Sequence, residues 1–106
     1  DGRFETWFDA LEFMKNEIDK MDYDVCLLGC GAYGMPLAAH VKRSGKKAVH
    51  LGGSLQLLFG IRGARWENSN YNATYNYSKL MNEFGVKPSA TETPSKAQQV
   101  EEGCYW

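Results

Sequence analysis

The fold is decided by residues 24–34, which read DVCLLGCGAYG. The stretch before the first glycine is short and mostly apolar, which is typical of a strand that is buried on both faces in a parallel sheet. Gly29, Gly31 and Gly34 then match the spacing G-x-G-x-x-G. Pro36 follows at a position that suits the first turn of a helix, where a missing N–H costs nothing. The segment therefore predicts a strand, a tight glycine turn and a helix.

The segments on either side extend this motif. Downstream, Gly45 suits the position after the last turn of the helix, and residues 47–51 form a second apolar strand. Residues 24–51 thus predict two parallel strands joined by a right-handed crossover. Upstream, apolar residues recur at spacings of three and four, which indicates an amphipathic helix whose aromatic side chains we expect to pack on a sheet. These residues are Phe4, Trp7, Phe8, Leu11, Met14, Ile18 and Met21.

The second half of the chain is less regular. Ser54 is placed to cap a short helix, and a loop over residues 66–78 leads into a helix expected at about 74–84. We predict an α/β fold, a Rossmann-like three-layer fragment with a small parallel sheet (a βαβ core) flanked by helices, over residues 1–87. Residues 88–106 are expected to form an extended C-terminal tail that packs on this domain.

Composition limits the class of protein. The chain has 106 residues, 43% of them hydrophobic and 24% charged, which is ordinary for one small globular domain. Its net charge of −1 argues against a nucleic-acid partner, and no apolar run is long enough to span a membrane. The chain begins with Asp1 and shows no signal-peptide pattern, so we expect a cytoplasmic fragment of a larger protein, or a homo-oligomer. The three cysteines are expected to be reduced structural thiols.

The glycine turn is the sharpest functional motif. In a turn of this kind the second glycine lets the backbone come close to a phosphate, and the helix start offers N–H groups to an anion. We therefore expect Gly29, Gly31, Ala32, Tyr33 and Gly34 to bind a phosphate-bearing ligand. The alternative is a tight turn between strand and helix that holds no ligand.

A second glycine turn follows the second strand. Gly52, Gly53 and Ser54 form a possible anion nest, and it lies beside the first turn if the two strands are neighbours. Arg62 and Arg65 are then placed to close over a phosphate with bidentate contacts, or else they are solvated surface charges. The two turns together predict a ligand crevice.

The end of the second strand argues against NAD. A dinucleotide site needs an acidic residue there to hold the ribose hydroxyls, and this chain has His50 instead. A nucleotide-diphosphate sugar needs no such carboxylate, so we expect it rather than NAD. His50 either donates to a phosphate or serves in acid–base chemistry, or it is hydrogen-bonded within the fold.

Other polar patterns predict no site. His40 lies inside the predicted helix and is expected to be structural. No spacing of histidines and cysteines indicates a metal site. The run Asp22-Tyr23-Asp24 is similar to a metal-binding D-x-D motif but precedes its strand, at the wrong end of the sheet, so we interpret it as a loop.

The stretches 25–39 and 46–53 together resemble the C-terminal nucleotide-binding part of bacterial GT-D-type glycosyltransferases. Residues 55–66 and 103–106 are similar to a related group of uncharacterised bacterial proteins. The resemblance implies a nucleotide-diphosphate-sugar site in which Gly29, Gly31 and Gly34 lie near the diphosphate. It also implies a catalytic D-x-E motif, which does not occur in this sequence. The chain is thus expected to be part of a transferase or a relative without the activity.

Three hypotheses follow. The first is the nucleotide-binding or nucleotide-sugar-binding domain of a glycosyltransferase-like protein, without a complete catalytic centre in this chain. The second is a NAD- or FAD-type binding domain of an oxidoreductase. The third is a non-enzymatic oligomerisation module.

Overall fold

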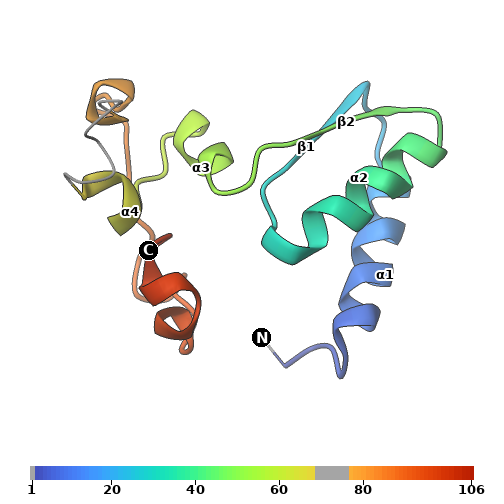
Figure 1. Ribbon diagram of the computed structural model, residues 1–106, viewed down its shortest axis with the longest axis horizontal. Helices are drawn as coiled ribbons and strands as arrows, with labels where there is room; N and C mark the ends of the chain where they lie inside the picture. The colour runs from blue at the N-terminus through green and yellow to red at the C-terminus, as the bar shows by residue number, and fades with distance from the viewer. Residues whose placement is uncertain (1, 69–76) are drawn as a thin grey trace. The chain divides into compact units, whose positions relative to one another are not determined.

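The computed structural model describes residues 2–68 and 77–106, and the chain divides into two compact units, Asp1–Leu55 and Gln56–Trp106 (Figure 1). The division lies after Leu55, whereas the sequence suggested a boundary between residues 87 and 88. Each unit is described by itself. Within the described residues, no helix has both the length and the apolar character that a membrane span requires.

The first unit contains the predicted βαβ arrangement. Its elements are α1 (Trp7–Asp19), β1 (Val25–Leu28), a 3-10 turn (Gly31–Tyr33), α2 (Gly34–Arg43) and β2 (Lys47–His50). The two strands are parallel, and the register pairs Val25 with Lys47 and Leu28 with His50. The unit is therefore a small α/β fold with a two-stranded parallel sheet. This confirms the predicted α/β class and the predicted parallel sheet.

Local sequence signals explain where both helices begin and end. At the start of α1, the Thr6 side chain accepts from the Asp9 N–H while the Asp9 carboxylate accepts from the Thr6 N–H, which is a capping box. At the end of α2, the Gly45 N–H donates to Lys42 O and the Lys46 N–H donates to Val41 O. Gly45 has a φ of 86°, so this end is a Schellman motif that uses the glycine where the sequence placed it.

The two helices run parallel and pack with the sheet. Leu11 of α1, Leu28 of β1 and Leu37 of α2 form the core cluster. At one end, Trp7 stacks on Tyr33 just before α2, and at the other end His40 Nε2 lies 2.7 Å from Asp19 Oδ1. Because N-terminal ends meet at one contact and C-terminal ends at the other, α1 and α2 point in the same direction.

The opposite face of the sheet is open within this unit. Val25, Leu27 and Val49 keep 43–46% of their surface exposed. The unit therefore has two layers among its described residues, not the three that were predicted. The aromatic residues of α1 also differ from expectation, because Phe8 is 70% exposed and Trp7 packs on the Tyr33 ring and not on the sheet. Leu11, one turn further along, is the side chain that fills the core.

The second unit is built from short helices and long-range backbone hydrogen bonds. Its elements are the end of α3 (Ser54–Leu58), α4 (Ala64–Glu67) and 3-10 turns at Tyr77–Leu80, Ala97–Gln99 and Glu101–Gly103. Backbone bonds run from Val86 N to Gly60 O and from Arg62 N to Val86 O, and Arg65 N donates to Cys104 O. Among its described residues, the buried apolar side chains are those of Leu57, Trp66 and Ala97.

Two predictions fail in this second unit. The helix expected at about 74–84 is only a short 3-10 turn at Tyr77–Leu80, and residues 81–84 are not helical; residues 74–76 and most of the predicted 66–78 loop lie outside the described residues. The tail 88–106 is not extended. Glu101, Glu102 and Gly103 have φ values of 46°, 57° and 72°, which curl the chain so that Gly103 is buried.

Candidate functional site

The candidate site lies where β1 and β2 end. Leu28 O, the last carbonyl of β1, accepts hydrogen bonds from the Leu51 N–H at 2.9 Å and from His50 Nδ1 at 3.2 Å. The turns that follow the two strands are therefore side by side, as the sequence predicted. In open α/β sheets this edge, at the carboxyl ends of the strands, is where ligands bind.

Two of the motif glycines are packed and leave no room for a side chain. A Cβ at Gly29 would lie 2.8 Å from Leu55 Cβ and 2.9 Å from Gly52 O. A Cβ at Gly34 would overlap the imidazole of His50. These glycines let the second turn and the His50 ring come close to the first turn. The predicted crevice between the turns is thus filled at Gly29 by Leu55.

Gly31 and Gly52 are different because the space beside them is open. Gly31 has a φ of 52° and Gly52 a φ of 57°, and a Cβ at either position would meet no atom within 4 Å. Both glycines are needed for backbone conformation, and their backbone stays accessible to a ligand. Gly31 begins the 3-10 turn Gly31–Tyr33, which leads into the ten-residue helix α2.

His50 is exposed but tied to the fold at one ring nitrogen. Because Leu28 O can only accept, His50 Nδ1 carries the proton of their hydrogen bond. Nε2 of the neutral ring is then an acceptor, suited to a ligand hydroxyl. It becomes a donor to a phosphate only when the ring is protonated. The geometry is therefore compatible with both roles expected for His50, which are a contact with a ligand and a hydrogen bond within the fold.

Of the remaining predicted site residues in the first unit, some are exposed and others make contacts within the unit. Ala32 is exposed, and the Tyr33 ring stacks on Trp7 with centroids 5.0 Å apart and planes 10° apart. Gly53 is half-buried. Ser54 is the first residue of α3, not the residue before it, and its hydroxyl donates to Leu51 O at 2.6 Å. Its Oγ–H therefore holds the second turn together.

Arg62 and Arg65 belong to the second unit and have partners there. The Arg65 guanidinium pairs with the Glu101 carboxylate, donates to the Tyr105 hydroxyl at 3.2 Å and lies over the Tyr105 ring. Arg62 Nη2 is 3.4 Å from Gly85 O. We therefore assign neither arginine to the site at the glycine turns.

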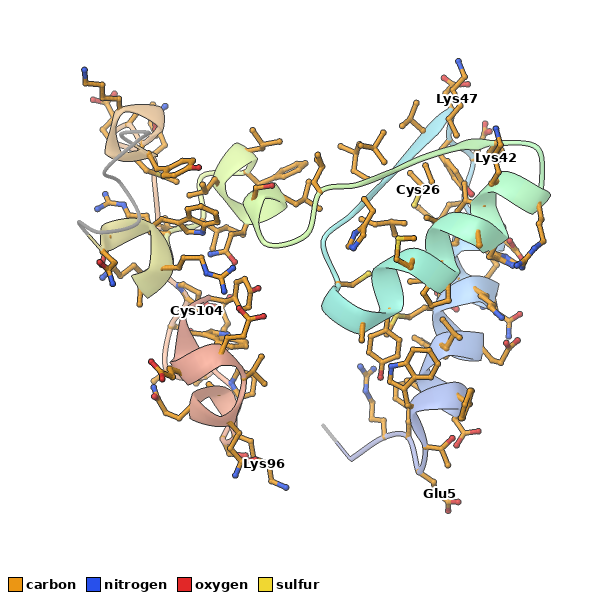
Figure 2. All side chains as sticks on the ribbon, in the orientation of Figure 1. Glu5, Cys26, Lys42, Lys47, Lys96 and Cys104 are labelled. Atoms are coloured by element: carbon orange, nitrogen blue, oxygen red, sulfur yellow. The ribbon has the colours of Figure 1, made fainter. Side chains whose placement is uncertain are left out.

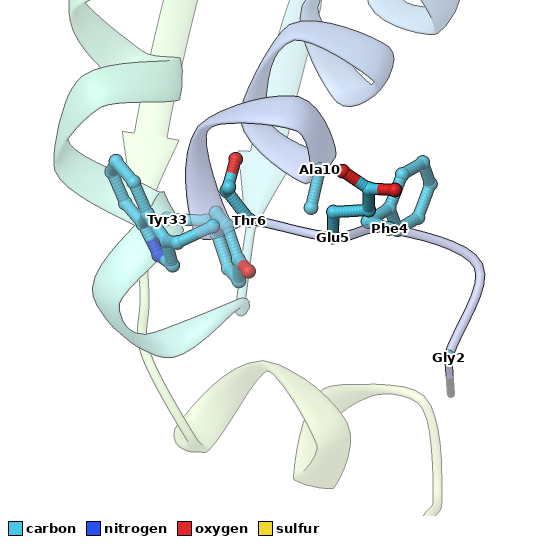
Figure 3. A pocket seen from close by; sticks show the side chains of 7 residues that line it. Gly2, Phe4, Glu5, Thr6, Ala10 and Tyr33 are labelled. Atoms are coloured by element: carbon cyan, nitrogen blue, oxygen red, sulfur yellow. The ribbon is translucent and has the colours of Figure 1, made fainter.

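The structure also shows a pocket that the sequence did not predict. It has a volume of about 290 Å³ and lies at the start of α1, beside the glycine turn (Figure 3). Trp7 and Tyr33 line it, together with Glu5 and Thr6. The cluster of aromatic residues at the start of the first helix was the available signal, but the spacing of three and four assigned that cluster to a packing role.

The cysteines and the acidic motif give no second site. Cys26 packs between the sheet and α2, and burial raises the pKa values of the Cys26 and Cys30 thiols (Figure 2). The described residues hold no group of three side chains that could bind a metal. Asp22 and Asp24 precede β1 at the opposite end of the sheet, as expected, beside Lys46 and Lys47.

No family model, curated protein or solved structure matches this chain.

Proposed function

We propose that the first unit is a Rossmann-like nucleotide-binding domain that holds the phosphates of its ligand at the turn 29–34. The observation that carries this proposal is Gly31, whose backbone is left-handed and open to solvent between the end of β1 and the start of α2. A glycine with these properties lets a phosphate come against the backbone, which a Cβ would prevent.

The orientation of the two helices supports an anion at this edge. Because α1 and α2 are parallel, the N-terminal end of each, with its partial positive charge, lies at the Trp7–Tyr33 contact beside the turn. Asp9 already satisfies the first turn of α1 through the capping box. The N-terminal end of α2 has no acidic residue in its first turn, so it is the end that would attract a phosphate.

The ligand that we propose is a nucleotide-diphosphate sugar, and the chain would be part of a glycosyltransferase-like protein. The position where a NAD site carries a carboxylate holds His50, and its ring is turned back onto Leu28 O and Gly34. NAD is therefore the less favoured ligand. The proposal is for binding alone, and no residue is assigned a catalytic role. The three unpaired cysteines fit a reducing compartment such as the cytoplasm.

The chain offers a matched pair of variants to test this proposal. Gly31 and Gly45 both have positive φ and open space at Cβ, but they flank opposite ends of α2. Each Gly→Ala change should cost roughly 1 kcal/mol of stability through backbone strain. We expect Gly31→Ala to weaken binding of UDP or GDP at least tenfold in calorimetric titrations, whereas Gly45→Ala binds as the wild type does.

Other results would contradict the proposal in different ways. Equal binding by both variants would show that the turn 29–34 does not contribute to the binding site. Binding of NADH, with no binding of UDP or GDP, would favour the oxidoreductase hypothesis. Absence of all binding in the folded wild type would leave the non-enzymatic hypothesis.

The open sheet face favours that second candidate function, an oligomerisation module. Val25, Leu27 and Val49 present an apolar surface that a second copy of the chain would cover. Light scattering of the wild type and of Leu27→Lys tests it: we expect a dimer that the charged variant converts to a monomer. A monomeric wild type at high concentration would exclude this role.

A further inference from the structure

We propose that the pocket at the start of α1 takes a guanine base, so that the nucleotide bound by the first unit is a guanine nucleotide. This inference rests on the proposed function, because the base would belong to the ligand whose phosphates lie at the glycine turn. Tyr33 is shared between the turn and the pocket, so the two sites adjoin (Figure 3). One nucleotide would therefore reach from Gly31 into the pocket.

The walls of the pocket suit a flat ligand. Phe4, Trp7 and Tyr33 line it, and Trp7 keeps 38% of its surface exposed although one face stacks on Tyr33. A nucleobase stacks on exposed aromatic rings because every base has a π-face. The volume of about 290 Å³ is at the small end of ligand pockets, which suits one part of a nucleotide better than the whole.

The polar groups of the pocket select the base. Thr6 Oγ1 donates to Asp9 Oδ2 at 2.7 Å and accepts from the Asp9 N–H, so its hydroxyl is used by the helix cap. Among the described residues, the Glu5 carboxylate has no hydrogen-bond or ion-pair partner, and Glu5 lines the pocket. Glu5 is the one charged residue among the described residues that line the pocket, so its carboxylate is the group best suited to accept hydrogen bonds from a ligand.

A carboxylate accepts hydrogen bonds at both oxygens and donates none. Guanine presents two adjacent donors, N1–H and the N2 amino group, which match the two oxygens of Glu5. Adenine places an acceptor beside its amino group, and uracil has one N–H between two carbonyls. The negative charge of Glu5 also repels phosphate from the pocket, which leaves the phosphates at Gly31 and the base at Glu5.

The test follows the Trp7 indole N–H signal by NMR while the intact chain is titrated with GDP, ADP or UDP. We expect GDP to shift this signal and to bind about tenfold more tightly than ADP or UDP, the range for one good bidentate contact to a base. Glu5→Gln should abolish this preference, because its NH₂ group faces the guanine donors. The matched control is Glu12→Gln, which removes the same charge from an exposed position on α1 and should keep the preference.

The outcomes separate this inference from the proposed function. Equal binding of the three diphosphates, weakened by Gly31→Ala, would keep the phosphate site and overturn the guanine assignment. A GDP preference that survives in Glu5→Gln would overturn the role of Glu5. A shift of Trp7 by free glucose and not by guanosine would assign the pocket to a sugar. Absence of diphosphate binding would overturn both proposals.

Discussion

Different interactions stabilise each of the two units of the chain. In the first unit, the buried side chains come from α1, β1 and α2, and regular spacing along the sequence brings them to one face. In the second unit, helices of four or five residues and 3-10 turns are joined by backbone hydrogen bonds between segments far apart, such as Arg65 N to Cys104 O. The first unit therefore depends on side-chain packing, and the second on close approach of its backbone segments.

The largest expected effect is at the core of the first unit. Leu37 is 2% exposed, so Leu37→Ala should lower the free energy of unfolding by about 3 kcal/mol through lost burial and a cavity. When amide signals are followed by NMR in increasing urea, the native signals of residues in α1 and β2 should disappear at a lower urea concentration than in the wild type. The urea midpoint of residues 85–106 should be unchanged. Met35→Ala, at a site that is 70% exposed on the same helix, is the control. An equal decrease of the urea midpoint in both units would show that they unfold together.

The next effect is expected at a backbone contact of the second unit. A Cβ at Gly63 would lie 2.8 Å from Tyr105 O and 2.9 Å from Cys104 O, and neither carbonyl can move without the chain end. Gly63→Ala should therefore cost roughly 1–3 kcal/mol, the range for overpacking, and should expose the Arg65 amide to hydrogen exchange. In the control, Gly60→Ala, no atom lies closer than 3.9 Å, so only backbone strain is added. A tolerated Gly63→Ala would mean that this unit is looser than described.

The smallest expected effects have opposite dependence on pH in the two units. Burial raises the pKa values of Cys26 and Cys30, so the folded first unit holds these protons more tightly than the unfolded chain. Its stability should be complete below the ordinary thiol pKa of about 8.5 and should fall as pH rises above it. Urea midpoints at pH 7.5 and pH 10 measure this, and Cys26→Ala/Cys30→Ala should show a smaller decrease.

In the second unit, Ser89 lowers the pKa of Glu92 by donating to its carboxylate from the backbone N–H and from the hydroxyl. This turn should be stable above the ordinary glutamate pKa and should open as pH falls through the lowered value. The Ser89 amide shift reports the opening, and Glu92→Gln should remove its pH dependence. A turn that opens equally in both proteins would assign the change to another group.

The same difference explains what the sequence could predict. The strand before Gly29 and the end of α2 at Gly45 were predictable, because each depends on neighbours in sequence. The parallel pairing was predictable because a strand, a helix and a strand in succession favour a parallel crossover. The burial of Ala97 and the curled end of the chain were not, because they depend on contacts with distant segments and on left-handed residues such as Glu101, whose type does not favour that conformation.

The candidate site divides in the same way. The two glycine turns and their adjacency followed from the motif, but which glycines are open did not. That distinction depends on Leu55 and the His50 ring, which fill the space at Gly29 and Gly34. The pocket lined by Glu5 and Trp7 depends on the parallel packing of two helices, which periodicity along one helix does not specify.

The short span between the paired strands has a consequence for how the first unit folds. His50 and Leu28, which pair at the end of the sheet, are only 22 residues apart, and α2 occupies most of the chain between them. Forming α2 shortens that chain and brings β2 back to β1, so the entropy lost on closing the loop is small. A parallel sheet is ordinarily slow to form because its contacts are distant. This sheet should form early, and the hydrogen bond from His50 to Leu28 O closes the loop between the two strands.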